Sequence, residues 1–145
     1  MIREIKAFEV GLCLEAGQVF FDESKVPGGF DNATFCKNWG NLINSGTGTI
    51  LVAFEGTTQI GALGAVLCPD MFNGDLVAVE AFWYMIKKYR GQGLRLLSAF
   101  EAWAKDRSAK RVAMIHLESL QPEVLRRVYE RFGYKLIESH YVKTI

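Results

Sequence analysis

The sequence predicts an α+β domain of three layers, in which helices flank a mixed, mostly antiparallel sheet. Three strand-like runs follow one another between residues 49 and 86, and after Tyr89 the apolar spacing changes from the two-residue period of strands to the 3.6-residue period of helices. The 145 residues, 50% of them hydrophobic, suit a single globular domain over residues 1–145. The expected order of elements is β-α-α-β-β-β-α-β-α-β-β.

The first part of the chain contains a short strand and two helices. Residues 2–7 have the pattern of a strand, and residues 8–23 that of a helix, because their apolar side chains recur at helical spacing. A second helix is expected to begin at Asp31 or Asn32, since either residue can cap a helix N-terminus. The polar, glycine-containing stretch 44–48 ends it.

Three strands are expected next. They are Thr49–Glu55, Gln59–Cys68 and Asp75–Ile86. Short stretches rich in Gly, Asp and Asn separate them, which favours an antiparallel meander with hairpin turns.

Helices and strands alternate in the last third of the chain. The apolar stripe of residues 93–105 predicts a helix that packs on the sheet. The nearly continuous apolar run 112–117 is typical of an interior strand. Pro122 begins another helix, and Gly133 ends it. Two final strands are predicted at Tyr134–Ile137 and Tyr141–Ile145.

Composition excludes several classes of protein. The net charge of +1 disfavours a general nucleic-acid binder, and the chain has neither an N-terminal signal pattern nor an apolar run long enough to span a membrane. Cys13, Cys36 and Cys68 lie far apart without the spacing of a metal site. We therefore expect reduced thiols, a cytoplasmic protein, no metal, and neither nucleic acid nor membrane as a partner.

Charge is divided unevenly along the chain. Residues 1–80 contain 4 Lys and Arg against 10 Asp and Glu, whereas residues 81–145 contain 13 against 6. The basic second part either faces an anionic ligand or consists of helices with solvated basic faces.

A glycine-bearing basic turn joins the third long strand to the next helix. It reads Arg90-Gly91-Gln92-Gly93-Leu94-Arg95, and the free N–H groups of a first helical turn bind phosphate oxygens. Leu96 stands where a dinucleotide fingerprint needs a third glycine, and the Gly-Lys-Ser/Thr of a P-loop is missing. The turn therefore either binds another phosphate-bearing ligand or only connects strand and helix.

Two segments resemble the GCN5-related N-acetyltransferase (GNAT) family. Arg90 and Gly93 match the family's Gln/Arg-x-x-Gly-x-Gly/Ala signature, whereas Arg95 departs from its small last residue. Residues 128–134 are similar to its Tyr-x-x-x-Gly-Phe/Tyr segment. The predicted order of elements is also that of the family.

The resemblance implies acetyl-CoA as cosubstrate and direct acetyl transfer to an amine acceptor within a ternary complex. The CoA pyrophosphate is then expected over the glycine turn and the pantetheine arm along the preceding strand. The residues expected to bind it are Trp83, Tyr84, Met85, Arg90, Gly91, Gln92, Gly93, Leu94 and Arg95.

The same resemblance implies catalytic roles. Tyr129 occupies the position of the general acid that protonates the CoA thiolate. Glu80 is the first candidate for the base and Glu118 the second, with a water relay as the alternative, and His116 is less favoured. Pro122 replaces a helix asparagine that is common in the family. The residues proposed to line an acceptor pocket are Phe20, Phe21, Phe30 and Tyr141.

Other readings of the sequence stay open. A catalytically silent acyl-CoA-binding or structural module would explain Arg95 and the missing asparagine. A nucleotide-binding regulator would use the glycine turn, although no carboxylate stands at the spacing expected for a ribose or a metal. The sequence leaves the acceptor unidentified, and the chain either monomeric or a homodimer.

Overall fold

A mixed sheet forms the centre of the computed structural model, which describes residues 1–117 and 121–145. Within them the sheet has five strands in the order β1-β2-β3-β4-β5. All neighbours are antiparallel except β4 and β5, which are parallel. The strands are β1 (Ile2–Glu4), β2 (Gly48–Glu55), β3 (Thr58–Pro69), β4 (Leu76–Met85) and β5 (Arg111–Ala113). The expected α+β fold is confirmed.

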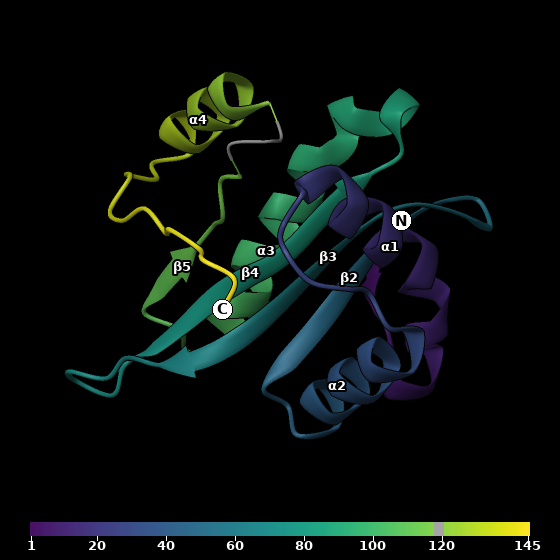
Figure 1. The fold of residues 1–145 in the computed structure, drawn as a ribbon, viewed down its shortest axis with the longest axis horizontal. Helices are drawn as coiled ribbons and strands as arrows, with labels where there is room; N and C mark the ends of the chain where they lie inside the picture. Colours follow the sequence, from purple (N-terminus) through teal and green to yellow (C-terminus); the bar gives the residue numbers. More distant parts are fainter. Residues whose placement is uncertain (118–120) are drawn as a thin grey trace.

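Helices cover both faces of this sheet (Figure 1). One face carries α3, and the opposite face carries α1 and α2, while α4 lies beyond the edge formed by β5. The helical elements are η1 (Ala7–Cys13), α1 (Leu14–Ser24), α2 (Asn32–Asn44), η2 (Lys87–Gln92), α3 (Gly93–Asp106) and α4 (Pro122–Arg131), of which η1 and η2 are 3₁₀ helices.

Two apolar clusters hold the three layers together. Leu96, Leu97 and Phe100 of α3 are completely buried against one face of the sheet. On the other face Trp39 of α2 packs with Phe82 of β4, ring edge to ring face at 5.4 Å between centroids. Full burial of each large apolar side chain contributes about 1.5–3 kcal/mol, so these two clusters fix the helices relative to β4.

The predicted helices and long strands lie within a few residues of their observed positions. Asp31 caps α2, because its side chain accepts a hydrogen bond from the amide of Thr34 at 2.7 Å. The first strand is shorter than expected, and residues 7–13 form a 3₁₀ helix ahead of α1. The interior strand predicted at residues 112–117 is reduced to β5, which ends at Ala113.

The prediction of two C-terminal strands is wrong. Residues 134–145 contain no strand, and Leu136, Ile137 and Tyr141 are 81%, 89% and 97% exposed. A strand needs a paired edge as well as a suitable sequence, and β5 offers only three residues. The segment begins instead against α3, where the hydroxyl of Tyr134 donates to Glu101 at 2.7 Å.

β4 and the edge strand β5 separate at the point that creates the site. β5 pairs with β4 only opposite Val77–Val79. In the part of the chain that the structure describes, no strand lies beside the far edge of β4 after Val79. A bulge follows directly, because Glu80 pairs with Ala65 whereas Phe82 pairs with Gly64, which leaves Ala81 as an extra residue. The second half of β4 therefore has one unpaired edge.

Candidate active site

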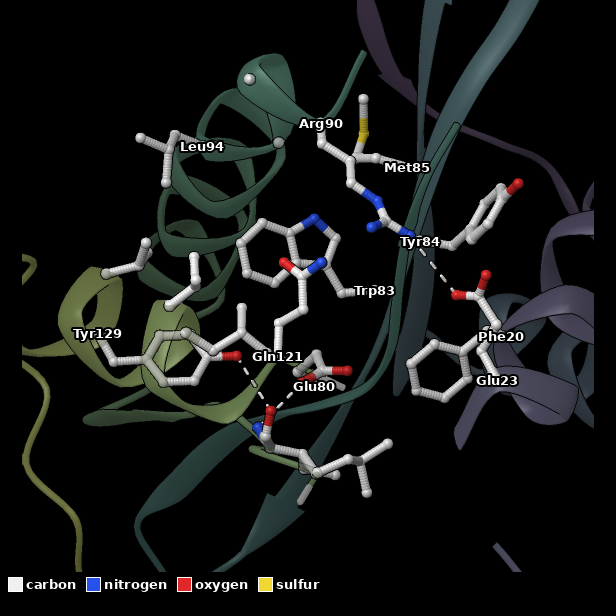
Figure 2. Close-up of a pocket in the computed structure, with 17 residues that line it drawn as sticks. Phe20, Glu23, Glu80, Trp83, Tyr84, Met85, Arg90, Leu94, Gln121 and Tyr129 are labelled. Atoms are coloured by element: carbon white, nitrogen blue, oxygen red, sulfur yellow. Dashed lines mark hydrogen bonds and ion pairs between the residues drawn. The ribbon is translucent and has the colours of Figure 1, made fainter. Parts of the chain in front are cut away.

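A cavity of about 370 Å³ opens where β4 separates from β5. β4, the η2–α3 turn, the segment after β5, α4 and α1 all contribute to its wall (Figure 2). Its lining residues are Phe20, Glu23, Glu80, Trp83, Tyr84, Met85, Arg90, Gly91, Gly93, Leu94, Ile115, Leu117, Gln121, Val124, Leu125, Val128 and Tyr129.

Glu80 is the buried carboxylate of this cavity. Its side chain is only 2% exposed and accepts a hydrogen bond from the amide of Ile115 at 2.9 Å. Burial raises the pKa of Glu80 to about 7, although the bond from Ile115 acts in the opposite direction. The carboxyl group is thus poised to exchange a proton near neutral pH.

Tyr129 approaches the same residue from α4. It lies on the inner face of the helix, 8% exposed, and its hydroxyl donates to the carbonyl oxygen of Ile115 at 3.0 Å. Burial, and then the charge of Glu80, raises the pKa of Tyr129 above its usual range. The phenol keeps its proton at neutral pH. In Figure 2 the side chains of Glu80 and Tyr129 point toward the same part of the cavity wall.

The glycine turn forms the opposite end of the cavity. Gly91 is exposed, and a Cβ atom built on it would have no neighbour within 4 Å, so the backbone of η2 is open to a ligand. The first turn of α3 contains no acidic residue, and its N-cap, Gln92, makes no capping bond through its side chain. The amide of Gly93 already donates to the carbonyl oxygen of Arg90, but the positive end of the α3 dipole meets no acidic side chain in this turn and can attract an anion.

Arg90 extends from this turn toward α1. Its guanidinium group forms an ion pair with Glu23 at 3.7 Å. Both side chains are about half exposed, so the pair is worth little in water and can exchange for other charged partners. Figure 2 shows this pair spanning the cavity between η2 and α1.

Trp83 contributes an unused hydrogen-bond donor. Its indole Nε1 is buried and has no partner among the described residues. A buried donor without a partner costs about 1–3 kcal/mol, which a ligand carbonyl can recover. Gly93 lets the indole pack beneath α3, because a Cβ atom there would be 3.2 Å from the Cζ2 atom of Trp83.

The structure gathers most of the predicted site residues around one cavity. Those that line it are Glu80, Trp83, Tyr84, Met85, Arg90, Gly91, Gly93, Leu94 and Tyr129. Gln92 and Arg95 are not part of the lining, and they bond to each other at 3.3 Å. Glu118 lies outside the described residues. His116 does not line the cavity either, although its Nε2 atom is buried without a partner in the described part of the chain.

The acceptor residues expected from the sequence are divided. Phe20 lines the main cavity, and Phe21 and Phe30 line a second cavity beside it, whereas Tyr141 is exposed and lines neither. Sequence reasoning missed Ile115 entirely. It acts through its backbone, so its side chain carries no signal of that role.

No group of three or more His, Cys, Asp or Glu side chains is placed to hold a metal ion within residues 1–117 and 121–145. In the same residues no helix is both long and apolar enough to cross a membrane.

Comparison with known proteins gives consistent results. The model of the acetyltransferase (GNAT) family matches residues 19–134. A predicted acetyltransferase from Clostridium acetobutylicum, solved with acetyl-CoA, has a TM-score of 0.79 at 15% identity, over 99% of this chain and 95% of that one. An aminoglycoside acetyltransferase from an uncultured soil sample has a TM-score of 0.78 at 16% identity, over 100% and 97%. A ribosomal-protein-alanine N-acetyltransferase from Brucella melitensis has 0.73 at 16%, over 100% and 99%. Comparison with curated proteins gives no match.

Proposed function

The chain belongs to the acetyltransferase (GNAT) family, and on that premise we propose that it transfers an acetyl group from acetyl-CoA directly to an amine acceptor. The observation that carries this proposal is the link between Glu80 and Tyr129 through Ile115, beside the unpaired edge of β4. A proton acceptor and a proton donor thus border one cavity. General acid–base catalysis of acyl transfer to an amine uses one of each.

The residues around the cavity fit acetyl-CoA. The unpaired edge of β4 offers backbone groups to the amides of the pantetheine arm, and the free indole N–H of Trp83 offers a further donor. The first turn of α3 and the guanidinium group of Arg90 suit the pyrophosphate. When bound, acetyl-CoA supplies the activated acyl thioester.

Glu80 is proposed to receive the proton of the acceptor ammonium. A lysine-like amine with a pKa of ~10.4 costs about 4.6 kcal/mol to deprotonate at pH 7. A carboxylate whose pKa is about 7 is an effective base at that pH because nearly half of it is ionised. Its position at the bulge of β4 brings it to the wall of the cavity.

Tyr129 is proposed to give a proton to the departing sulfur. Its hydroxyl proton is directed at the carbonyl of Ile115, so the hydroxyl has to turn toward the cavity to donate there. In the balance of the reaction, the amine nitrogen bonds to the acetyl carbon and the carbon–sulfur bond breaks. The ammonium loses two protons. One of them is balanced by the proton that the thiolate gains to become the thiol, and the other is released to solvent.

Calorimetry with acetyl-CoA, followed by measurement of free thiol released in the presence of primary amines, tests this proposal. We expect acetyl-CoA to bind and thiol release to require an amine. A folded protein that does not bind acetyl-CoA would overturn the proposal. Binding without turnover on any amine would favour the silent acyl-CoA-binding module instead, for which Pro122 in place of the asparagine is the supporting feature.

A further inference from the structure

A second, open cavity of about 220 Å³ lies next to the first, between α1, α2 and β4. Among the described residues its lining consists of aromatic side chains, an alanine and a glycine: Gly17, Phe20, Phe21, Phe30, Phe35, Trp39, Ala81 and Phe82. None of these side chains is charged or carries a hydroxyl group, so burial of a ligand's hydroxyl or amino groups here is unfavourable. The lining therefore selects an apolar group.

The aromatic rings around this cavity form a connected series. Neighbouring centroids are 6.1 Å apart for Phe21 and Phe30, 5.2 Å for Phe30 and Phe35, and 6.0 Å for Phe35 and Phe82, all in tilted arrangements. Phe20, which also contacts Phe82 at 6.2 Å, is only half buried, as are the first three rings. Part of the apolar surface of these rings is exposed to solvent, and an inserted apolar group would cover it. An aromatic ring placed against these rings would gain ring–ring contacts that an aliphatic chain cannot make.

Gly17 sets how closely two of these rings approach α1. A Cβ atom at this position would be 3.0 Å from Cε2 of Phe35 and 3.2 Å from Cζ of Phe30. Glycine is unfavourable inside a helix relative to alanine. Its presence here lets both rings lie close against α1, and any larger residue would displace them.

The aromatic cavity adjoins the group proposed to act as base. Phe20 lines both cavities, and Ala81, which lines the aromatic one, directly follows Glu80, which lines the other. A ring held in the aromatic cavity therefore has a short path to Glu80. The two cavities share a wall and a stretch of β4.

Carboxylates border this side of the main cavity. Burial, and then the charges of Glu23 and Glu15, raise the pKa of Tyr84, which lines the main cavity. Glu23 forms a weak, exposed ion pair with Arg90. Arg90 acts against these charges at Tyr84, but once the pyrophosphate engages Arg90, as proposed above, Glu23 is left to pair with a cationic acceptor.

We propose that the acceptor is a primary arylalkylamine, which places its aromatic ring in the aromatic cavity and its ammonium group toward Glu23 and Glu80. This inference rests on the proposed function. A cavity of about 150 Å³ lined by apolar side chains holds benzene, so the larger volume here accommodates a phenyl ring with a short alkyl link. Polyamines and amino sugars would bring charges or hydroxyl groups into an apolar lining.

The test compares 2-phenylethylamine with ethanolamine and spermidine as acceptors at saturating acetyl-CoA. We expect kcat/KM to be about 10- to 100-fold higher for 2-phenylethylamine, because only its ring gains apolar contact. Saturation-transfer NMR gives a readout independent of turnover. We expect transfer from the protein to the phenyl protons of 2-phenylethylamine.

Gly17→Ala supplies the matched variant. The new methyl group pushes Phe35 and Phe30 into the cavity while improving helix propensity, so the fold is retained. The preference for 2-phenylethylamine over ethanolamine should fall at least fivefold, and its NMR signal should weaken. Gly11→Ala, whose methyl group would meet nothing within 4 Å, is the control. It should retain both the preference for 2-phenylethylamine and the NMR signal.

The outcomes separate the two proposals. Spermidine or ethanolamine used as well as 2-phenylethylamine, in a protein that binds acetyl-CoA, would overturn the acceptor class and leave acetyl transfer standing. A preference for 2-phenylethylamine that Gly17→Ala does not reduce would overturn the assigned cavity. A folded protein that fails to bind acetyl-CoA would overturn the proposed function, and the acceptor role with it.

Discussion

Glu80 and Tyr129 are joined through a single residue, since Ile115 donates its amide to the carboxylate at 2.9 Å and accepts the phenol at its carbonyl at 3.0 Å. The two side chains come from β4 and from α4, which are far apart in the sequence. Ile115 follows the end of β5, where the chain has left the sheet. Its backbone groups are therefore not used in the sheet and can hydrogen-bond to both side chains.

Glu80→Gln should lower kcat/KM roughly 10²–10⁴-fold at pH 7.5, because the amide cannot accept a proton. The wild-type rate should rise between pH 6 and 8 with a midpoint near the pKa of about 7, as the carboxyl group ionises. In the variant this rise should disappear. Stopped-time assays across pH measure both effects. Glu130→Gln, on the exposed face of α4, is the control, and an unchanged pH profile in Glu80→Gln would remove Glu80 from the role of base.

Glu80 should also make stability depend on pH. Its pKa in the folded state, about 7, is above the ordinary value of 4.5, so the folded protein binds more protons than the unfolded chain between these values. The free energy of unfolding should therefore fall as pH rises from about 4.5 to 7, by about 3 kcal/mol at most. Urea denaturation at pH 5 and pH 7.5 measures the change. Glu80→Gln should lack this contribution, and an identical dependence in both proteins would contradict the assignment.

Tyr129→Phe should reduce kcat roughly 10²–10⁴-fold while the Kd for acetyl-CoA changes little, because the ring stays and only the hydroxyl is lost. Loss of the bond to Ile115 should cost about 1 kcal/mol of stability. Single-turnover kinetics and calorimetry separate the two quantities. Tyr134→Phe is the matched control: it also loses a hydrogen bond, to Glu101, but its ring does not line the cavity. Equal kcat in both variants would return Tyr129 to a packing role.

Gly91→Asp should weaken acetyl-CoA binding at least tenfold, because it places a carboxylate where the pyrophosphate is expected. Gly91 suits this test better than Gly93, since its Cβ atom has open space whereas that of Gly93 would press on Trp83. Calorimetry measures the Kd. Gly91→Ala adds the same Cβ without charge and should bind as the wild type does. Similar affinities for the Asp and Ala variants would place the pyrophosphate elsewhere.

The local sequence pattern was sufficient to predict the helices and the long strands. The apolar stripe predicted α3 within one residue of its observed end, and Asp31 capped α2 as expected. These features depend on side chains a few residues apart. The resemblance to a family also predicted Glu80 and Tyr129 as site residues. Their expected roles depend on a carboxyl group and a hydroxyl group, which the residue type reveals.

Features that depend on distant backbone were not predictable in this way. The C-terminal residues 134–145 alternate as strands do, but pairing depends on the length of β5, which ends at Ala113. The role of Ile115 uses only its amide and carbonyl groups, and no residue type signals it. The aromatic cavity likewise depends on contacts between Gly17 of α1, Phe35 of α2 and Phe30, which lies between the two helices.

Gly64→Ala should destabilise the fold by about 1–3 kcal/mol through overpacking. Gly64 lies opposite Phe82 beside the bulge of β4, and a Cβ atom there would be 2.7 Å from Cδ1 of Phe82 and 2.7 Å from Cη2 of Trp39. Both rings are buried in the cluster beneath α2 and have little freedom to move. Chemical denaturation measures the loss.

Gly29→Ala is the control for this substitution, because Gly29 is exposed and its Cβ atom would meet nothing within 4 Å. Its stability should stay within about 0.5 kcal/mol of the wild type. Since Phe82 also lines the aromatic cavity, Gly64→Ala should raise the KM for 2-phenylethylamine as the ring is displaced, whereas Gly29→Ala should not. Wild-type stability in Gly64→Ala would contradict the close packing of Phe82 and Trp39 against this glycine.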